Sequence, residues 1–258
     1  MKRVLVLDIG NTNIVCGIYQ GGKMIWFARF FSSRNRTADE YFALFSSLLK
    51  DIRLQDINHI AMASVVPELT RIWQHLATKY FNAAVTEITA LSPLGIKYKV
   101  KDPSFIGADL VANAFGAWKK YKTNCIVIDL GTATTIQLVG AKGVFEGSVI
   151  APGLKTGASQ LFEKAALLSE IEIAAPTSLL GLNTRDSMLS GIVSGHAYML
   201  EAFIQKLKLL YFDHKQISTI ITGGIADLLK PLVSSIDIVD KTLTLDGLNL
   251  ALMHLLEQ

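Results

Sequence analysis

Two copies of one short motif constrain the fold of this chain more than any other feature. In the first copy, the apolar run Val4–Leu7 leads into Asp8 and a turn of Gly, Asn and Thr. The second copy repeats this order, with Asp129 and Gly131 opposite Asp8 and Gly10 at an offset of 121 (129 − 8 and 131 − 10). An apolar run bounded by turn residues is typical of a buried strand. Each acid is therefore expected at the end of a core strand, beside a turn that can cradle phosphate while the acid holds a cation.

The repeat continues beyond the motif. At the same offset, Gly22 meets Gly143, Ile18 meets Val139 and Met24 meets Phe145. A single Asp-ended strand and turn would indicate an ordinary hairpin. A duplicated strand–turn–strand unit indicates two similar half-domains, because solenoids have much shorter periods. We expect one half at residues 1–122 and the other at residues 123–258.

Apolar periodicity and turn residues predict the same element types in both halves. Three strands open each half, at 3–8, 13–20 and 23–31 and again at 125–130, 133–140 and 144–150. The other expected elements are a helix after the capping box Thr37–Glu40, a strand at 57–63, a helix at 67–79, a strand at 85–88, helices at 108–121, 153–161 and 184–212, a strand at 217–222, a helix at 225–232 and a last helix after Asp246. Hairpins followed by crossovers give a mixed sheet covered by helices, so the fold class is α/β.

Composition narrows the classes of function. Charged residues make up 18% of the 258 residues, below the roughly 25% of typical soluble domains, which predicts extensive burial or a subunit interface. A net charge of +3 is too small to indicate nucleic-acid or membrane binding. Cys16 and Cys125 lie in apolar strands and are expected to be buried thiols in a reducing compartment. Lys2-Arg3 precedes only four apolar residues, so we predict no signal peptide, no membrane span and a cytoplasmic protein.

Further motifs give the chain a resemblance to a known family. The matching segments are Asp8-Ile9-Gly10-Asn11-Thr12-Asn13, Gly107-Ala108-Asp109, Asp129-Leu130-Gly131-Thr132-Ala133-Thr134-Thr135, Pro152-Gly153, Asn183-Thr184 and Thr222-Gly223-Gly224. In this order and at this total length they resemble type III pantothenate kinase, within the superfamily of actin-like ATPases, sugar and acetate kinases and Hsp70. The resemblance implies two actin-like, ribonuclease H-like half-domains, each a mixed sheet with helices, around an ATP cleft. It also implies a homodimer that phosphorylates pantothenate with ATP, in the first step of coenzyme A biosynthesis.

The resemblance also implies a role for particular residues. The ATP-binding residues would be Asp8, Ile9, Gly10, Asn11, Thr12, Asn13, Ile14, Val15, Thr132, Gly223 and Gly224, and the substrate-binding residues Gly107, Ala108, Asp109, Leu110 and Thr184. Asp109 would act as general base. Asp8 would hold Mg²⁺ through water, since Mg²⁺ keeps much of its hydration shell. Asp129 would help to bind a monovalent cation, K⁺ or NH₄⁺.

Several of these residues have a plainer interpretation. From local sequence alone, Asp109 and Thr184 would each cap a helix. Leu110 stands where the family usually has Arg, and Val100 where many members have an aromatic residue, with Tyr98 nearby. The small residues in Ser190–Ala197 predict either a dimer contact or core packing. Two other functions are considered: another small-molecule kinase of the superfamily, and a nucleotide-binding accessory factor of transcription without kinase activity.

Overall fold

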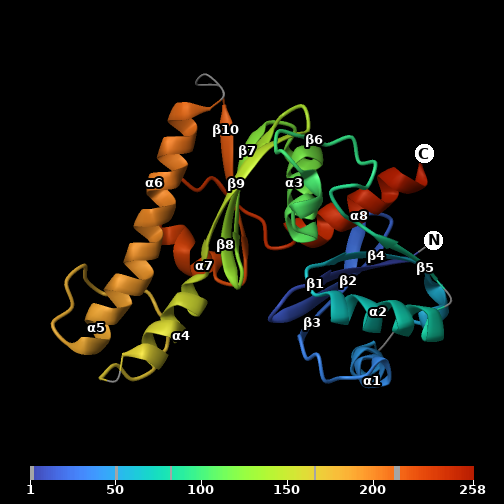
Figure 1. Cartoon of the computed structure of the whole chain (residues 1–258), viewed down its shortest axis with the longest axis horizontal. Coiled ribbons are helices and arrows are strands. Elements are labelled where there is room, and N and C mark those ends of the chain that lie inside the picture. Colours follow the sequence, from blue (N-terminus) through green and yellow to red (C-terminus); the bar gives the residue numbers. More distant parts are fainter. Residues whose placement is uncertain (1–2, 50–51, 82, 166, 212–215) are drawn as a thin grey trace. The chain divides into compact units, whose positions relative to one another are not determined.

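The computed structural model describes residues 3–49, 52–81, 83–165, 167–211 and 216–258 (Figure 1). The chain divides into two compact units. Unit 1 comprises Met1–Lys120 together with Leu243–Gln258, and unit 2 comprises Tyr121–Thr242. We expected all residues after 122 in the second half, so the placement of the last segment in unit 1 corrects that division.

Unit 1 is built on a five-stranded mixed sheet. Its strands are β1 (Arg3–Ile9), β2 (Asn13–Gln20), β3 (Lys23–Phe31), β4 (Ile57–Ser64) and β5 (Ala84–Glu87), in the order β3-β2-β1-β4-β5. The first three strands are antiparallel neighbours, and β4 and β5 continue the sheet parallel to β1. Central β1 is buried from Val4 to Leu7, as its apolar run predicts.

Helices cover both faces of the unit 1 sheet (Figure 1). One face packs on α1 (Ala38–Leu48) and α2 (Pro67–Tyr80), and the other on α3 (Ala108–Tyr121) and α8 (Leu243–Leu256). The capping box before α1 is confirmed, because Thr37 and Glu40 bond each other's backbone N–H groups. Short 3₁₀ turns at Leu54–Asp56 and Pro103–Phe105 and a two-residue strand, β6 (Lys97–Tyr98), were not expected.

Close packing on α3 explains why α8 belongs to unit 1. Gly116 and Gly247 face each other so closely that a Cβ on Gly116 would lie 3.0 Å from the Cα of Gly247. The Thr244 hydroxyl donates to Asn113 Oδ1 (2.7 Å), and Lys120 pairs with Asp246 (2.5 Å). The helix begins at Leu243, before the start after Asp246 that we expected.

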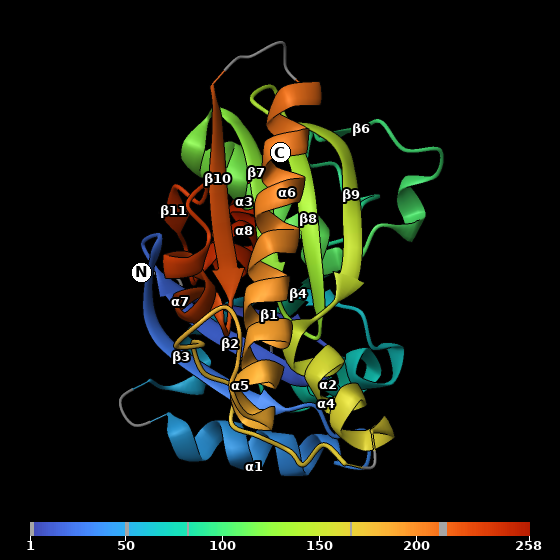
Figure 2. The same cartoon turned by 90° about the vertical axis from the view of Figure 1, so that its left-hand side faces the viewer.

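Unit 2 repeats the topology of unit 1. Its strands are β7 (Asn124–Leu130), β8 (Ala133–Gly140), β9 (Val144–Pro152), β10 (Ile217–Gly223) and β11 (Ile238–Val239), and within the unit they follow the order β11-β10-β7-β8-β9. The helices are α4 (Leu154–Lys164), α5 (Thr184–Leu189), α6 (Gly195–Leu210) and α7 (Ala226–Leu229), with a 3₁₀ turn at Lys230–Leu232. Figure 2 shows α6 lying over this sheet and running along its strands, and its apolar residues pack in the same core. The long helix expected at 184–212 runs from Thr184 to Leu210, with a π-helical segment at Ser190–Ser194; residue 212 lies outside the described residues.

The strand bounds refine the internal repeat. The offset is 121 between β1 and β7, 120 between β2 and β8, and 121 again between β3 and β9. The turn between β7 and β8 is thus one residue shorter than the turn between β1 and β2. The turn between β8 and β9 is one residue longer than the turn between β2 and β3, which restores the offset. Ile18 therefore corresponds to Leu138, where both sheets shift register, and the expected match with Val139 is wrong. The expected correspondence of Met24 with Phe145 is confirmed, because the two residues have equivalent partners on the neighbouring strand of their own sheets.

The helices and the two cysteines bear on the location and reactivity of the protein. None of the helices formed by the described residues is both long and apolar enough to cross a bilayer. Cys16 and Cys125 are buried free thiols, as expected. Burial, followed by the charge of Asp8, raises the pKa of Cys16 well above its usual value, so this thiol stays protonated and unreactive.

Candidate active site

The turn after β1 is anchored from both sides. The Gly10 N–H donates to the Asn13 carbonyl (2.9 Å), and the Ser32 N–H donates to the Thr12 carbonyl (2.9 Å). The Ser32 hydroxyl also donates to the Gly10 carbonyl (2.6 Å). Asn11 and Thr12 at the tip remain exposed, and Asp8 is half-buried at the strand end. A fixed turn with an exposed tip beside a carboxylate suits the binding of a metal–phosphate group.

The turn after β7 is anchored in the same way. The Gly131 N–H donates to the Ala133 carbonyl (3.1 Å), and the Gly153 N–H donates to the Thr132 carbonyl (3.1 Å). The Thr156 hydroxyl donates to the same Thr132 oxygen (2.7 Å). A Cβ on Gly153 would collide with the carbonyl oxygens of Gly131 and Thr132. The Pro152-Gly153 motif therefore needs glycine so that the start of α4 can pack on this turn.

The predicted adenosine segment lies beside the second turn. In the pairing of β7 with β10, Thr222 is next to Asp129 and Gly223 is next to Leu130. Gly223 has a φ of +96°, and a Cβ there would lie 2.6 Å from the backbone N of Leu130. Only glycine combines this backbone conformation with this close approach. The structure thus brings Asp129, the Thr132 turn and Gly223 together at one sheet edge, where the carboxyl ends of parallel strands meet.

Asp109 lies in the first turn of α3, over a glycine. Gly107 caps the helix, since its carbonyl accepts from the Val111 N–H (3.1 Å). The Asp109 carboxylate accepts from the Leu110 N–H (2.8 Å), and a Cβ on Gly107 would lie 2.5 Å from that carboxylate. Burial raises the pKa of Asp109, while the N–H groups of Leu110 and of Asp109 itself act in the opposite direction. Asp109 thus lies inside the helix and is not the N-cap residue itself, although its carboxylate bonds backbone N–H groups at the helix start as the capping interpretation expects.

Within unit 1, Val65 lies between the start of α3, where Asp109 is, and the turn after β1. The Val65 N–H donates to the Ile9 carbonyl (3.1 Å), and Val65 Cγ1 lies 3.6 Å from the position of a Cβ on Gly107. The turn after β1 and the start of α3 are thus neighbours. Ala108 and Leu110, two more of the predicted substrate residues, have buried side chains, 7% and 6% exposed.

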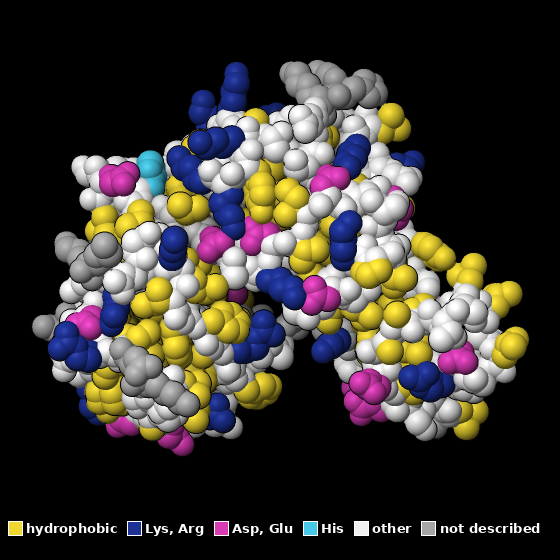
Figure 3. Space-filling model, turned by 180° about the vertical axis from the view of Figure 1, so that it is seen from behind, with side chains coloured by type: hydrophobic (Ala, Val, Ile, Leu, Met, Phe, Trp, Pro, Cys, Tyr) yellow, Lys and Arg dark blue, Asp and Glu magenta, His cyan; other side chains and the backbone are white. Residues whose placement is uncertain are grey.

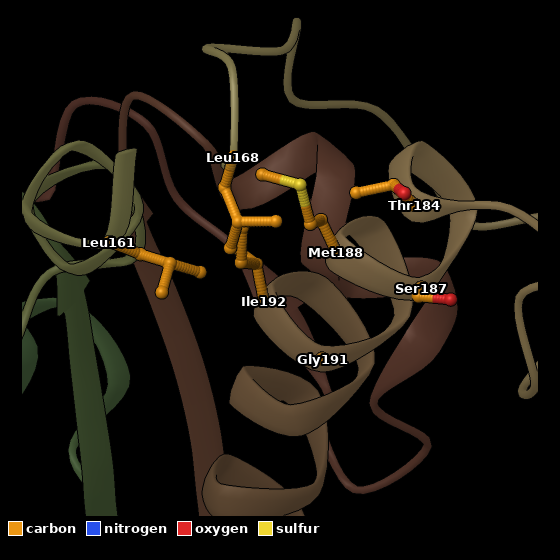
Figure 4. Close-up of a pocket in the computed structure, with 7 residues that line it drawn as sticks. All are labelled: Leu161, Leu168, Thr184, Ser187, Met188, Gly191 and Ile192. Carbon is orange, nitrogen blue, oxygen red and sulfur yellow. The ribbon is translucent and has the colours of Figure 1, made fainter. Parts of the chain in front are cut away.

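Thr184 is exposed at the start of α5, and Asn183 is the actual N-cap. The Asn183 side chain accepts from the Asp186 N–H (2.9 Å), so the interpretation of Thr184 as the cap is wrong. Thr184 instead borders a pocket of about 430 Å³ in unit 2 (Figure 4). Thr184 and Ser187 place hydroxyls on one side, opposite apolar side chains. The lining residues are Leu161, Leu168, Thr184, Ser187, Met188, Gly191 and Ile192.

The oxygen-bearing side chains fit the implied cations. The described residues contain no group of three or more His, Cys, Asp or Glu side chains that could hold a metal. Mg²⁺ in kinases commonly takes one or two carboxylates together with substrate phosphates, so a single Asp8 fits this mode. Asp129 faces Thr135 across the hairpin, and the buried Thr135 hydroxyl has no hydrogen-bond partner among the described residues. A hard cation, which prefers oxygen ligands, would use both groups.

His196 is a polar residue of this region that the sequence did not reveal. Its Nε2 bonds the Thr134 hydroxyl (2.9 Å), and Thr134 is fully buried beside the second turn. Burial lowers the pKa of His196, so the ring is neutral near pH 7. No spacing signal joins Thr134 to a histidine 62 residues away on another element.

Comparison with solved structures places this fold in a known class. The duplicated mixed sheets have the fold of sugar kinases and actin-like ATPases. A ROK family glucokinase from Streptomyces griseus, solved with glucose and AMPPNP, shares the fold with a TM-score of 0.53 and 13% identity, over 97% of this chain and 99% of its own. A Campylobacter jejuni protein described as belonging to the Baf family of transcriptional activators aligns with a TM-score of 0.62 and 16% identity, over 98% and 100% of the two chains.

The chain belongs to the type III pantothenate kinase family, whose model matches residues 4–206. The protein of that name from Citrifermentans bemidjiense is 37% identical over 249 residues, which are 96% of this chain and 97% of the relative. The one from Agathobacter rectalis is 38% identical over 251 residues, or 96% and 95% of the two chains. The predicted family and fold class are thereby confirmed, whereas the roles of individual residues remain predictions.

Proposed function

We propose that this protein transfers the γ-phosphoryl group of ATP to the primary hydroxyl of pantothenate, the first step of coenzyme A biosynthesis. The observation that carries the proposal is the family match over residues 4–206 with both Asp-ended turns and Asp109 intact. Phosphoryl transfer depends on positioning and charge neutralisation more than on covalent chemistry. Anchored turns and a single well-placed carboxylate are therefore the parts that such an enzyme needs.

ATP binding is assigned to the two turns and the end of β10. Residues 8–15 and Thr132 would bind the phosphates through N–H and hydroxyl donors, and Gly223-Gly224 would contact the adenosine. The support is local geometry: both turns are held by backbone hydrogen bonds, and Gly223 lies directly beside the strand that precedes the second turn. Preformed donors of this kind lose little entropy when phosphate binds.

Asp109 is assigned the role of general base. The pantothenate oxygen would attack the γ-phosphorus, the bond to the β,γ-bridging oxygen would break, and ADP would leave. The hydroxyl proton would pass to the Asp109 carboxylate late in the step, because an alcohol is too weak an acid to be deprotonated in advance. Gly107, Ala108 and Leu110 are assigned to substrate binding in unit 1, and Thr184 of unit 2 is assigned the same role.

Two cations are assigned to the two strand-end carboxylates. Asp8 would hold Mg²⁺ through water, and Mg²⁺ would neutralise charge on the ATP phosphates. Asp129, with the Thr135 hydroxyl beside it, would hold K⁺ or NH₄⁺.

A homodimer is also proposed, through the α4–α5 side of unit 2. Figure 3 shows exposed hydrophobic side chains over this part of the molecule. Leu180 and Leu182 are 79% and 97% exposed, and a Cβ added to Gly191 or Gly195 would meet no atom within 4 Å. Such a face can accept a second subunit. Light scattering during gel filtration would show a dimer, and a monomer at micromolar concentration would contradict it.

The decisive experiment measures ADP release by the purified protein with ATP, Mg²⁺ and K⁺, with and without pantothenate. Release that depends on pantothenate supports the proposal. Release that depends instead on a sugar or on acetate would identify another small-molecule kinase. Nucleotide binding without turnover on any acceptor would favour the accessory-factor alternative. A cytoplasmic location, which the reaction would share with its ATP supply, remains a prediction.

A further inference from the structure

A second pocket lies within unit 1, at the carboxyl ends of β4 and β5. Its volume is about 430 Å³, and its wall includes the first two turns of α2. Most of the lining side chains are polar. The lining residues are Ser64, Val65, Pro67, Thr70, Arg71, Gln74 and Glu87.

This pocket adjoins the proposed catalytic carboxylate. Val65 forms part of its wall, bonds the Ile9 carbonyl through its N–H, and has Cγ1 3.6 Å from the position that a Cβ on Gly107 would take. Val65 thus has the pocket on one side and the start of α3, with Asp109, on the other. All of these residues belong to unit 1.

The internal repeat gives the pocket a counterpart. Ser64 lies beside Ile9 in the pairing of β1 with β4, just as Gly223 lies beside Leu130 in the pairing of β7 with β10. The pocket of unit 1 thus occupies the edge that corresponds to the proposed adenosine edge of unit 2. Equivalent edges of the two sheets would then bind the two reactants, ATP at unit 2 and the phosphoryl acceptor at unit 1.

Arg71 is the cation among the lining residues of this pocket, and it is available to a ligand. Its side chain is exposed, and within the described ranges no carboxylate forms an ion pair with it. The other polar groups are already engaged with one another, since Thr70 donates to Ser64 Oγ (2.7 Å) and Gln74 donates to Glu87. Leu110, which follows the base, is apolar and buried and supplies no cation on its side of Val65. A planar guanidinium with open donors matches a carboxylate in geometry and charge.

We propose that this pocket binds the carboxylate end of the phosphoryl acceptor, with Arg71 as the specificity-determining residue. The inference rests on the proposed function, because pantothenate carries its primary hydroxyl at one end and its carboxylate at the other. Asp109 would meet the hydroxyl, and Arg71 would pair with the carboxylate. Glu87, fixed by Gln74, would accept from the amide N–H between them.

The test compares pantothenate with its alcohol analogue, in which a hydroxymethyl group replaces the carboxylate. Equilibrium binding and ADP release are measured for the wild type and for Arg71→Gln. The wild type should prefer pantothenate, and Arg71→Gln should weaken pantothenate binding about 10- to 100-fold while leaving the analogue and the KM for ATP unchanged. Arg53→Gln is the matched control, since Arg53 is an exposed arginine of the same unit, paired with Asp56. It should behave as the wild type.

Each outcome decides one of the two proposals. If Arg71→Gln keeps the wild-type preference for the carboxylate while the wild type turns pantothenate over, the Arg71 site is wrong and the function stands. If binding shows the Arg71-dependent preference but no ADP is released, the function is wrong and the site stands. If the wild type binds no pantothenate at all, both are overturned.

Discussion

Replacing Asp109 by Asn should separate catalysis from folding. The Asn side chain has nearly the same shape and retains an oxygen to accept from the Leu110 N–H, which is 2.8 Å from Asp109 Oδ1. It cannot take up the substrate proton. We expect kcat to fall by about 10²- to 10⁴-fold, with the KM for ATP little changed, because general base catalysis contributes that range. The assay is pantothenate-dependent ADP release at saturating ATP.

The same variant should gain stability at neutral pH. Burial raises the folded-state pKa of Asp109 above the value near 3.9 that an unfolded chain has. The unfolded state therefore loses its proton more readily, and ionisation costs folding free energy, about 1.4 kcal/mol for each pH unit between the two pKa values. Asn resembles the protonated acid and avoids this cost. The gain should be full at pH 7, should shrink as pH falls through the folded-state pKa, and should vanish below the unfolded-state pKa.

Asp102→Asn provides a control with the opposite sign. Asp102 is an exposed side chain nearby, and hydrogen bonds from the Ser104 side chain and backbone lower its pKa. Its variant should lose a little stability at neutral pH, should lose none at a pH below that lowered pKa, and should keep the wild-type kcat. Urea unfolding at pH 7 and at lower pH measures both effects.

Two results would refute the reasoning about Asp109. Near-normal turnover by Asp109→Asn would remove this residue from the role of base. A variant that is less stable than the wild type at pH 7 would show that the carboxylate stabilises α3, as the capping interpretation holds, and that its burial is not the dominant effect.

Three other parts of the molecule give further predictions. Gly247→Ala should destabilise the protein by about 2 kcal/mol or more, because the added Cβ would collide with the backbone of α3. The loss would be measured as a lower Tm. Gly157→Ala is the control and should be neutral or slightly stabilising, since a Cβ there meets no atom within 4 Å. Replacing K⁺ by Na⁺ in the kinase assay should reduce the rate sharply, and equal rates would remove the monovalent cation site. His196→Ala should cost about 1–3 kcal/mol in urea unfolding by leaving the buried Thr134 hydroxyl unpaired, and His196→Gln should recover part of that loss; equal stability of both variants would show that the bond contributes nothing.

Local patterns predicted much of the fold because their causes are local. The capping box at Thr37, Pro67 at the start of α2 and the apolar run of β1 depend on neighbouring residues alone, and the structure has each of them in place. The repeat was visible for a different reason: two Asp-turn motifs in the same hairpin setting keep the same residue types. Even so, its single offset missed the change of one residue at β8, because Leu138 and Val139 are both apolar and either one matches Ile18 in residue type.

Long-range packing set the features that the sequence did not reveal. The assignment of α8 to unit 1 depends on Gly116 meeting Gly247, which lie 131 residues apart. The bond between Thr134 and His196 and the open guanidinium of Arg71 likewise appear only when strands and helices are assembled. At Thr184 the error was local, because Asn183 and Thr184 are both good caps and the backbone of Asn183 has the extended conformation that a cap needs.

The return of α8 to unit 1 determines the order in which the chain can fold during synthesis. Unit 2 is one continuous stretch, Tyr121–Thr242, whereas unit 1 lacks a helix over one face of its sheet until Leu243–Gln258 emerges from the ribosome. Domains usually fold from the N-terminus onward as they are made. Here the second unit is complete first, and the first unit waits with Val4, Val6 and Ala61 uncovered on their α8 side. The interval before α8 emerges is therefore when this chain should depend most on chaperones.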